Sequence, residues 1–153
     1  MSALADRDHG VEAVGAELGE RLPGIVSRLS KGLRQAHVPI GLRPGEFPVL
    51  SFLLRRPGAT VSELAQAEGV RNPSMTALLA QMEAEGLVSK AGDRSDRRCV
   101  RVGLTARGEE LAKAAIAARR AWFAARLSGL TRAQIVALDR AMEALERLTE
   151  VEP

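Results

Sequence analysis

The segment DRSDRRCVRVGLT, residues 93–105, decides the fold prediction because it joins a short charged tip to an alternating strand. Arginines and aspartates fill its first half, and Val100-Arg101-Val102 then alternates apolar and basic side chains before Thr105. Such alternation is typical of a half-buried strand. A two-stranded ribbon with a cationic tip has the shape and charge to enter a nucleic-acid groove while its base packs on a core. The segment therefore predicts a β-wing.

Two short helices are predicted immediately before this wing, over residues 61–86. The run Thr60-Val61-Ser62-Glu63 is a capping box, so a helix is expected from there through Ala67, with Gly69 in the turn that follows. Asn72-Pro73 predicts the start of the next helix, with Asn72 as N-cap and proline in the first turn. Gly86 ends that helix before a strand over residues 87–90. The pattern is that of a winged helix-turn-helix.

The second helix of this pair has the features of a DNA-reading helix. Its outward face carries small side chains, including Ala77, which would let it approach base edges in the major groove. Gln81 and Asn72 can each form two hydrogen bonds with adenine, and Arg71 can take a phosphate or a guanine. The residues predicted to contact DNA are Arg71, Asn72, Ser74, Thr76, Gln81, Lys90, Arg94, Asp96, Arg97 and Arg98. The alternative is a helical hairpin that only packs.

The wing tip has its own expected chemistry. Arg97 and Arg98 are suited to an A·T-rich minor groove, where the potential is most negative. Asp96 would hold an arginine extended through a paired hydrogen bond. The alternative is a solvated loop whose ion pairs contribute little to stability.

Long amphipathic helices are predicted on both sides of this unit. Apolar residues recur at three- and four-residue steps from Val11 to Leu33, with a kink or short break expected at Pro23-Gly24 and a loose start over residues 1–8. A linker covers residues 37–45, and a helix is expected over residues 44–55. Its expected inward residues are Phe47, Leu50, Leu54 and Phe52. Thr105 starts a long helix that Ser128-Gly129 breaks, and Thr131 with Gln134 caps a last helix whose apolar residues are nearly heptad-spaced.

Composition narrows the class of protein. With 153 residues, 46% apolar and 27% charged, the chain fits one soluble globular domain. Residues 90–107 hold six basic and two acidic residues, an excess of four charges against +3 for the whole chain, which indicates a local cationic patch. A single cysteine, no apolar run of about 20 residues and no signal-peptide core predict a cytoplasmic protein without a membrane span. Four aromatic residues are too few to favour base-stacking recognition of single strands or RNA.

The chain resembles the multiple-antibiotic-resistance regulator (MarR) family of winged-helix transcription factors from about residue 11 to residue 150. The matching segments are GLRPGEFPVLSFL (41–53), ATVSELAQ (59–66), NPSMTALLAQMEAEGLV (72–88) and DRSDRRCVRVGLTARG (93–108). The resemblance implies a homodimer that binds a palindromic operator in double-stranded DNA, with the second helix in the major groove and the wing in the minor. It also implies that Arg98 inserts into the groove, Asp96 supports it, and Thr76 contacts DNA.

The expected architecture is mainly α with a small β-wing. One domain spans residues 1–153, with a winged helix-turn-helix lobe at 44–104 and N- and C-terminal dimerisation helices at 11–36 and 105–150. The resemblance further implies a repressor released by a small aromatic or phenolic effector, bound between the dimerisation helices and the lobe. His37, Phe47, Phe52 and Trp122 are the candidate lining residues. A plain surface or hinge histidine is the alternative for His37.

Two departures from the family keep a second function class open. The family often has an arginine at the position of Ala77 and a basic pair where this chain has Lys90-Ala91. A winged-helix protein-interaction module without specific operator binding is therefore the alternative. No nucleophile–base pairing, phosphate-cradling glycine loop or metal-ligand cluster is present in the sequence, so no enzyme, cofactor or metal is predicted. Cys99 is interpreted as a bystander on the wing strand.

Overall fold

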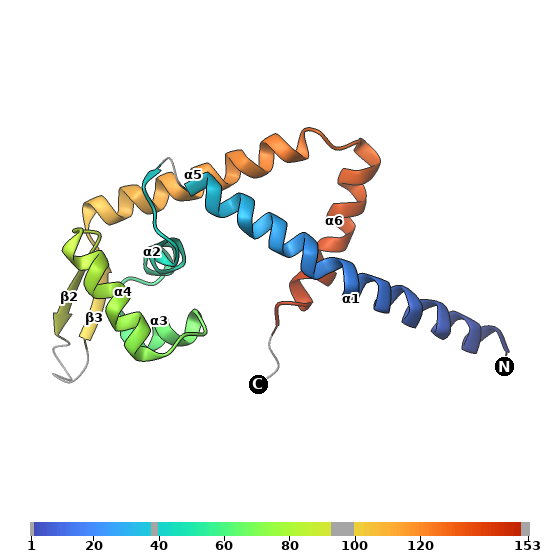
Figure 1. The fold of residues 1–153 in the computed structure, drawn as a ribbon, viewed down its shortest axis with the longest axis horizontal. Helices are drawn as coiled ribbons and strands as arrows, with labels where there is room; N and C mark the ends of the chain where they lie inside the picture. The colour runs from blue at the N-terminus through green and yellow to red at the C-terminus, as the bar shows by residue number, and fades with distance from the viewer. Residues whose placement is uncertain (1, 38–39, 93–99, 151–153) are drawn as a thin grey trace.

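The computed structural model describes residues 2–37, 40–92 and 100–150, with side chains from residue 12 onward. It is mainly helical with one small antiparallel sheet, as the sequence predicts (Figure 1). In chain order the elements are α1 (Ser2–His37), α2 (Glu46–Arg55), β1 (Ala59–Thr60), α3 (Val61–Ala67), α4 (Asn72–Ala84), β2 (Val88–Gly92), β3 (Val100–Leu104), α5 (Ala106–Leu127) and α6 (Arg132–Arg147).

The sheet has the strand order β1-β3-β2, and both pairings are antiparallel. The β2–β3 hairpin runs from the Val88–Leu104 pair to the Gly92–Val100 pair, so β2 lies further along the chain than the predicted residues 87–90. Pairing with β3 extends it, an effect that local sequence does not carry. The two-residue β1 was not predicted because it is too short for a periodic signal. The amide of Gly58 donates to the carbonyl of Val102 at 3.0 Å and holds β1 against β3.

Residues 46–104 enclose the hydrophobic core, and we call this segment the lobe. Helices α2, α3 and α4 and the sheet bury a set of apolar side chains that are at most 2% exposed. These are Val49, Leu50, Leu53, Leu64, Met75, Leu79, Met82, Leu87, Val88 and Val102. Burial on this scale excludes water from the whole contact between the reading helices and the sheet, so the lobe has a continuous core within one chain.

Helix α2 differs in two details from its prediction. It begins at Glu46 rather than residue 44, because Gly45 adopts a left-handed backbone with φ 89° just before it. The fully buried apolar positions are Val49, Leu50 and Leu53, whereas Phe47, Phe52 and Leu54 are only half-buried. The buried face is therefore rotated slightly from the predicted one.

Helix α5 begins against the lobe and then leaves it. The Thr105 hydroxyl accepts the amide of Gly108 at 3.0 Å and donates to the carbonyl of Gly86 at 2.6 Å. A Cβ on Gly108 would collide with the Leu87 carbonyl, so only glycine allows this close approach. Figure 1 shows α5 running from the lobe to α6, with the end of α1 packed beside it. Beyond this junction the helices have left the lobe core.

We call α1 and α6 the arms. The predicted loose start over residues 1–8 was wrong, because α1 is already helical from Ser2. The helix also continues through Pro23-Gly24 to His37, so there is no break at this point, and a kink there stays a prediction. A single proline removes one backbone donor, and the flanking turns keep their own hydrogen bonds. Among the described residues no side chain of α6 is buried. The arms expose large apolar side chains, including Val14, Leu18, Ile25, Val26, Leu29, Ile135, Leu138, Met142, Leu145 and Leu148.

Candidate nucleic-acid interface

The helix-turn-helix begins with the predicted capping box. The Thr60 hydroxyl accepts the Glu63 amide at 3.2 Å, and the Thr60 amide donates to the Glu63 carboxylate at 2.7 Å. This backbone hydrogen bond, followed by the hydroxyl contact, lowers the pKa of Glu63 from its ordinary value. Gly69, at φ 62°, makes the turn into α4. The box thus sets where α3 starts, and the turn sets the angle of α4.

Helix α4 has one buried and one open face. Met75, Leu79 and Met82 are buried in the lobe, whereas the predicted outward residues are all exposed. These exposed residues are Arg71, Asn72, Pro73, Ser74, Thr76, Ala77, Ala80 and Gln81. In the part of the chain that the structure covers, the side chains of Arg71, Ser74, Thr76 and Gln81 make no hydrogen bond or ion pair. Their polar groups are therefore available to an external partner.

Asn72 has a different role from the one predicted. The N-cap of α4 is Arg71, so Asn72 is the first helical residue and Pro73 follows it. Its side-chain amide donates to the Ser62 hydroxyl at 3.4 Å, which ties the start of α4 to α3. The amides of the first turn remain at an exposed helix N-terminus, the part of a helix suited to a phosphate.

The wing hairpin supports only part of the predicted site. Lys90 lies on β2, but its ammonium group pairs with the Glu83 carboxylate of α4 at 2.9 Å. The predicted residues Arg94, Asp96, Arg97 and Arg98, with Cys99, lie outside the described residues. The described hairpin ends at the Gly92–Val100 pair that flanks them.

Arg101 is a wing residue that the site prediction omitted. It is exposed on β3, and its guanidinium donates to the Gly58 carbonyl at 3.1 Å. This contact joins the wing strand to the end of β1. The alternation of Val100-Arg101-Val102 already placed Arg101 on the outer face, which was the signal available in the sequence.

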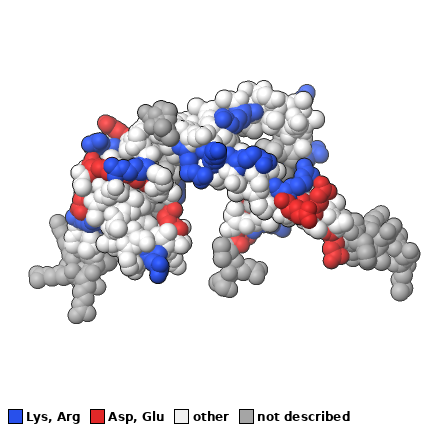
Figure 2. Space-filling model, in the orientation of Figure 1, with Lys and Arg blue, Asp and Glu red and all other residues white. Residues whose placement is uncertain are grey.

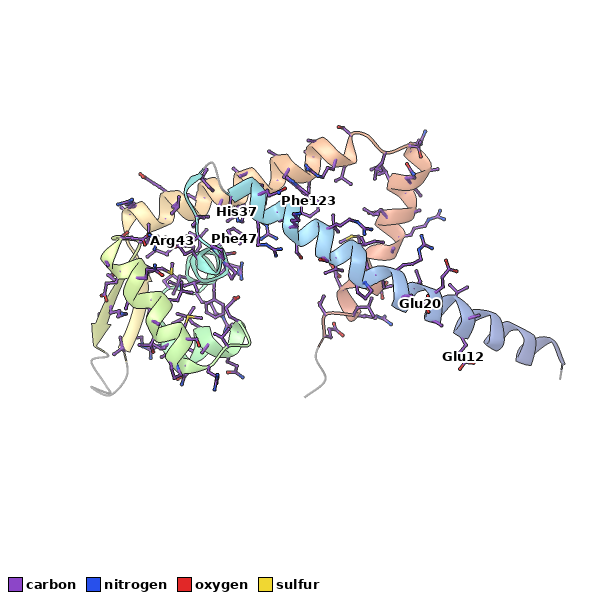
Figure 3. The ribbon with its side chains drawn as sticks, in the orientation of Figure 1. Glu12, Glu20, His37, Arg43, Phe47 and Phe123 are labelled. Atoms are coloured by element: carbon purple, nitrogen blue, oxygen red, sulfur yellow. The ribbon has the colours of Figure 1, made fainter. Side chains whose placement is uncertain are left out.

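A second candidate site lies where α1, α2 and α5 meet. A cavity of about 720 Å³ opens there, and two of the four predicted effector residues, His37 and Phe47, line it. Figure 3 shows these two side chains close together at the junction, with Arg43 nearby. Their ring centroids are 4.7 Å apart. The volume falls in the range typical of small-molecule pockets.

The other two predicted effector residues do not line this cavity. Phe52 packs against the lobe core. Trp122 lies against Gly32 of α1, meets Phe123 edge-on at 5.0 Å and stacks under the Arg126 guanidinium at 3.6 Å. Trp122 therefore packs at the α1–α5 crossing. The apolar spacing of α5 in the sequence could not tell this role from that of a residue lining a pocket.

Arg119 is the lining residue that sequence reasoning missed. Its guanidinium lies over the Phe47 ring, 4.5 Å from the centroid, and burial lowers its pKa. Burial, and then the charge of Arg119, also hold the pKa of His37 below its ordinary value. The sequence signal was a basic residue four positions after Ala115, at the edge of the buried seam of α5.

Metal and membrane sites receive no support from the geometry. Where the chain is described, no three His, Cys, Asp or Glu side chains are grouped to hold a metal ion. Within the same residues, every helix is too short or too polar to cross a membrane.

Comparisons with known proteins agree with this geometry. Residues 40–98 match the model of the MarR family. An HTH-type transcriptional regulator of Mycobacterium bovis is 34% identical over 138 residues, covering 90% of this chain and 96% of the relative. The HTH-type transcriptional repressor Rv2887 of Mycobacterium tuberculosis is 35% identical over 130 residues, covering 85% and 94%.

Solved structures show the same fold. The crystal structure of the Mycobacterium tuberculosis MarR family protein Rv2887 is 34% identical to this chain, with a TM-score of 0.71 and coverage of 86% of this chain and 95% of that one. A MarR family protein from Bacillus stearothermophilus is 28% identical, with a TM-score of 0.80 and coverage of 91% and 98%. The similarity extends over the lobe and the arms alike.

Proposed function

The chain belongs to the MarR family of transcriptional regulators, and from this membership we propose that it is a cytoplasmic, homodimeric repressor of a palindromic operator in double-stranded DNA. One observation carries the proposal: the outer face of α4 is fully exposed, and four of its polar side chains are without partners among the described residues. Small residues at Ala77 and Ala80 allow α4 to approach base edges closely. The wing arginines predicted from the sequence between β2 and β3 would enter the adjacent minor groove.

Dimerisation is proposed from the arms. An α6 without a buried side chain and an α1 with exposed Leu18, Ile25 and Leu29 leave a large apolar surface uncovered in one chain. A second copy would cover it, because terminal helices with matching apolar faces can pack on each other. The same arrangement would set the spacing of the two α4 helices on successive half-sites.

Release by a small-molecule effector is the third part of the proposal. The cavity at the junction of α1, α2 and α5 lies between the arms and the lobe, so its occupant would contact both. A ligand that binds one spacing of the two lobes more tightly shifts the population toward that spacing. The spacing that no longer fits successive half-sites releases the DNA.

The test is binding of the purified protein to DNA from upstream of its own gene, measured by fluorescence anisotropy across a salt series with scrambled DNA as competitor. We expect a preference of roughly 10³ or more for the upstream DNA. Gln81→Ala should reduce this preference, and Arg98→Ala should weaken binding and lower the salt slope by about one. Lys113→Ala removes a positive charge from the exposed side of α5 and is the control that should change neither.

A protein-interaction module is the competing function, and Ala77 in place of the family's frequent arginine is the observation that favours it. It predicts equal, weak binding to both DNAs, with dissociation constants of roughly 10⁻⁴ to 10⁻⁶ M. That result, together with no effect of Gln81→Ala, would contradict the proposed repressor.

A further inference from the structure

The cavity at the α1–α2–α5 junction has an unusual charge balance. Its lining includes four cationic side chains, Lys31, Arg34, Arg43 and Arg119, and no acidic one. Arg43 is neutralised by Glu85, with which it forms an ion pair. In the described residues, Lys31, Arg34 and Arg119 have no carboxylate within ion-pair distance. Figure 2 shows blue side chains gathered where the end of α1 meets α5.

Arg119 is the most strongly placed of these cations. It is half-buried, it stacks on Phe47, and burial lowers its pKa, yet within the described chain no acid compensates its charge. A partly desolvated cation without a counter-charge costs free energy, which an anionic ligand would offset. The buried acid Glu46 does not line the cavity, and its carboxylate accepts the Arg43 amide at 2.8 Å.

His37 provides an independent sign of a ligand. Its side chain lines the cavity and is 7% exposed, and its buried Nε2 atom has no hydrogen-bond partner among the described residues. A buried polar atom without a partner is rare in a folded protein and is usually satisfied by water or a ligand. His37 and Arg119 both contact the ring of Phe47, so a single ligand group at this ring would reach both.

Apart from Ser30 and Gln35, the remaining walls are apolar. Leu33, Leu42, Pro44, Phe47 and Pro48 provide a surface for a hydrocarbon skeleton, and the Phe47 ring provides a flat one. Resting on the proposed function of this cavity as an effector site, we propose that its ligand is a flat organic acid carrying at least two negative charges. One acidic group lies against Arg119 and His37, and the second lies against Arg34 or Lys31. A single charge would leave two of the three uncompensated cations unpaired.

The competing occupant of these cations is the first half of α1 from a second copy. This half carries Glu12, Glu17 and Glu20, and Figure 3 places Glu12 and Glu20 far from the cavity in the same chain. Glu17 pairs with Arg21 within its own helix. If the partner's acidic residues fill this role, the cations stabilise the dimer and not a ligand.

Isothermal titration calorimetry of the full-length protein, without DNA, tests whether the cavity binds an anionic ligand or whether its cations pair with a second copy of the chain. The probes are 2-naphthamide, 2-naphthoate and the 2,3- and 2,6-naphthalenedicarboxylates, which share one ring system and differ in charge. We expect no binding of the amide, weak binding of the monoanion, and at least one dicarboxylate bound about tenfold or more tightly than the monoanion. Equal affinity for the monoanion and both dianions, or no binding of any probe at millimolar concentration, would overturn the proposal.

Arg119→Gln and Arg120→Gln form the matched pair of variants. They are adjacent on α5, and only Arg119 lines the 720 Å³ cavity. Arg119→Gln should abolish the preference for the dianion, and Arg120→Gln should retain it. Sedimentation velocity on both variants checks the dimer: a dimer lost in Arg119→Gln, with no charge preference in the wild type, would assign the cations to the partner's α1. Calorimetry uses no DNA, so the ligand-binding result can be interpreted even if the protein does not bind an operator. The DNA-binding result can likewise be interpreted if no dianion binds.

Discussion

Helix α3 of the lobe and helix α6 of the arms begin with the same local structure but differ in how far their apolar side chains are buried. Helix α3 in the lobe and helix α6 in the arms both start with a threonine capping box, at Thr60 and Thr131. Helix α3 then buries Leu64 completely, whereas α6 buries no side chain and leaves Leu138 46% exposed. The same local signal therefore starts a helix whether or not a core exists to receive it. What decides the stability of each region is the surface that its apolar face meets.

The largest effect is expected from a cavity in the lobe. Leu64→Ala removes a fully buried side chain and should lower the free energy of unfolding by about 2–5 kcal/mol. Urea denaturation followed by circular dichroism measures this change, and it should be independent of protein concentration because the core lies within one chain. A loss below about 1 kcal/mol would mean that the lobe core relaxes around the cavity.

A charge on α6 should instead change assembly. Leu138→Lys places an ammonium group within the exposed apolar row of α6, and a second copy could not cover it without desolvating the charge. We expect the dimer dissociation constant to rise by about tenfold or more, measured by sedimentation equilibrium. Glu143→Lys, on a polar position paired with Arg147, is the control that should change it little. Equal effects of the two substitutions would remove α6 from the proposed interface.

The two capping threonines, Thr60 and Thr131, allow the same substitution to be compared in the lobe and in the arms. Thr60→Ala and Thr131→Ala each remove one capping hydroxyl, and each should cost about 1 kcal/mol of unfolding free energy. Only Thr60→Ala should also weaken DNA binding, since α3 positions α4. The serine variants keep the hydroxyl and should restore both stability and binding. A loss of DNA affinity in Thr131→Ala would show that the arms and the lobe are coupled through α6.

Local signals explain why much of this fold was predictable. Capping threonines, Gly69 and Gly86 mark helix ends through the chain's own hydrogen bonds and backbone angles, so the starts of α3, α5 and α6 were confirmed. The ends of β2 and the existence of β1 depend on pairing with β3, which is a long-range contact. Continuity of α1 through Pro23 depends on turns that remain bonded on both sides. Neither the strand pairing nor the continuity of α1 can be inferred from the residues at those positions alone.

The parts of the candidate sites that follow from helical spacing were predictable, and the parts that depend on packing between distant segments were not. The open face of α4 follows from helical spacing, and every residue predicted on it is exposed. The cavity is assembled from three helices and the segment between α1 and α2. Residue type therefore identified His37 and Phe47 but also suggested Trp122, which packs at the α1–α5 crossing. Arg119 was missed because its position at the edge of the α5 seam is only a weak sign of burial in a basic residue, and its contact with Phe47 is a long-range one.

The smallest effect is expected from the titration of His37 at the boundary between lobe and arms. Burial and then Arg119 lower its pKa in the folded protein, so the unfolded chain takes up the proton first as the pH falls. Stability should therefore decrease from about pH 7.5 toward about pH 5.5, through the ordinary histidine pKa of about 6.5. Urea midpoints across this range should show the slope in the wild type and a smaller slope in His37→Gln. His9→Gln changes the chain's other histidine and should keep the wild-type slope, because the argument depends on burial at one site. An unchanged slope in His37→Gln would mean that other groups set the acid sensitivity, and that the junction tolerates a charged histidine without an anion beside it.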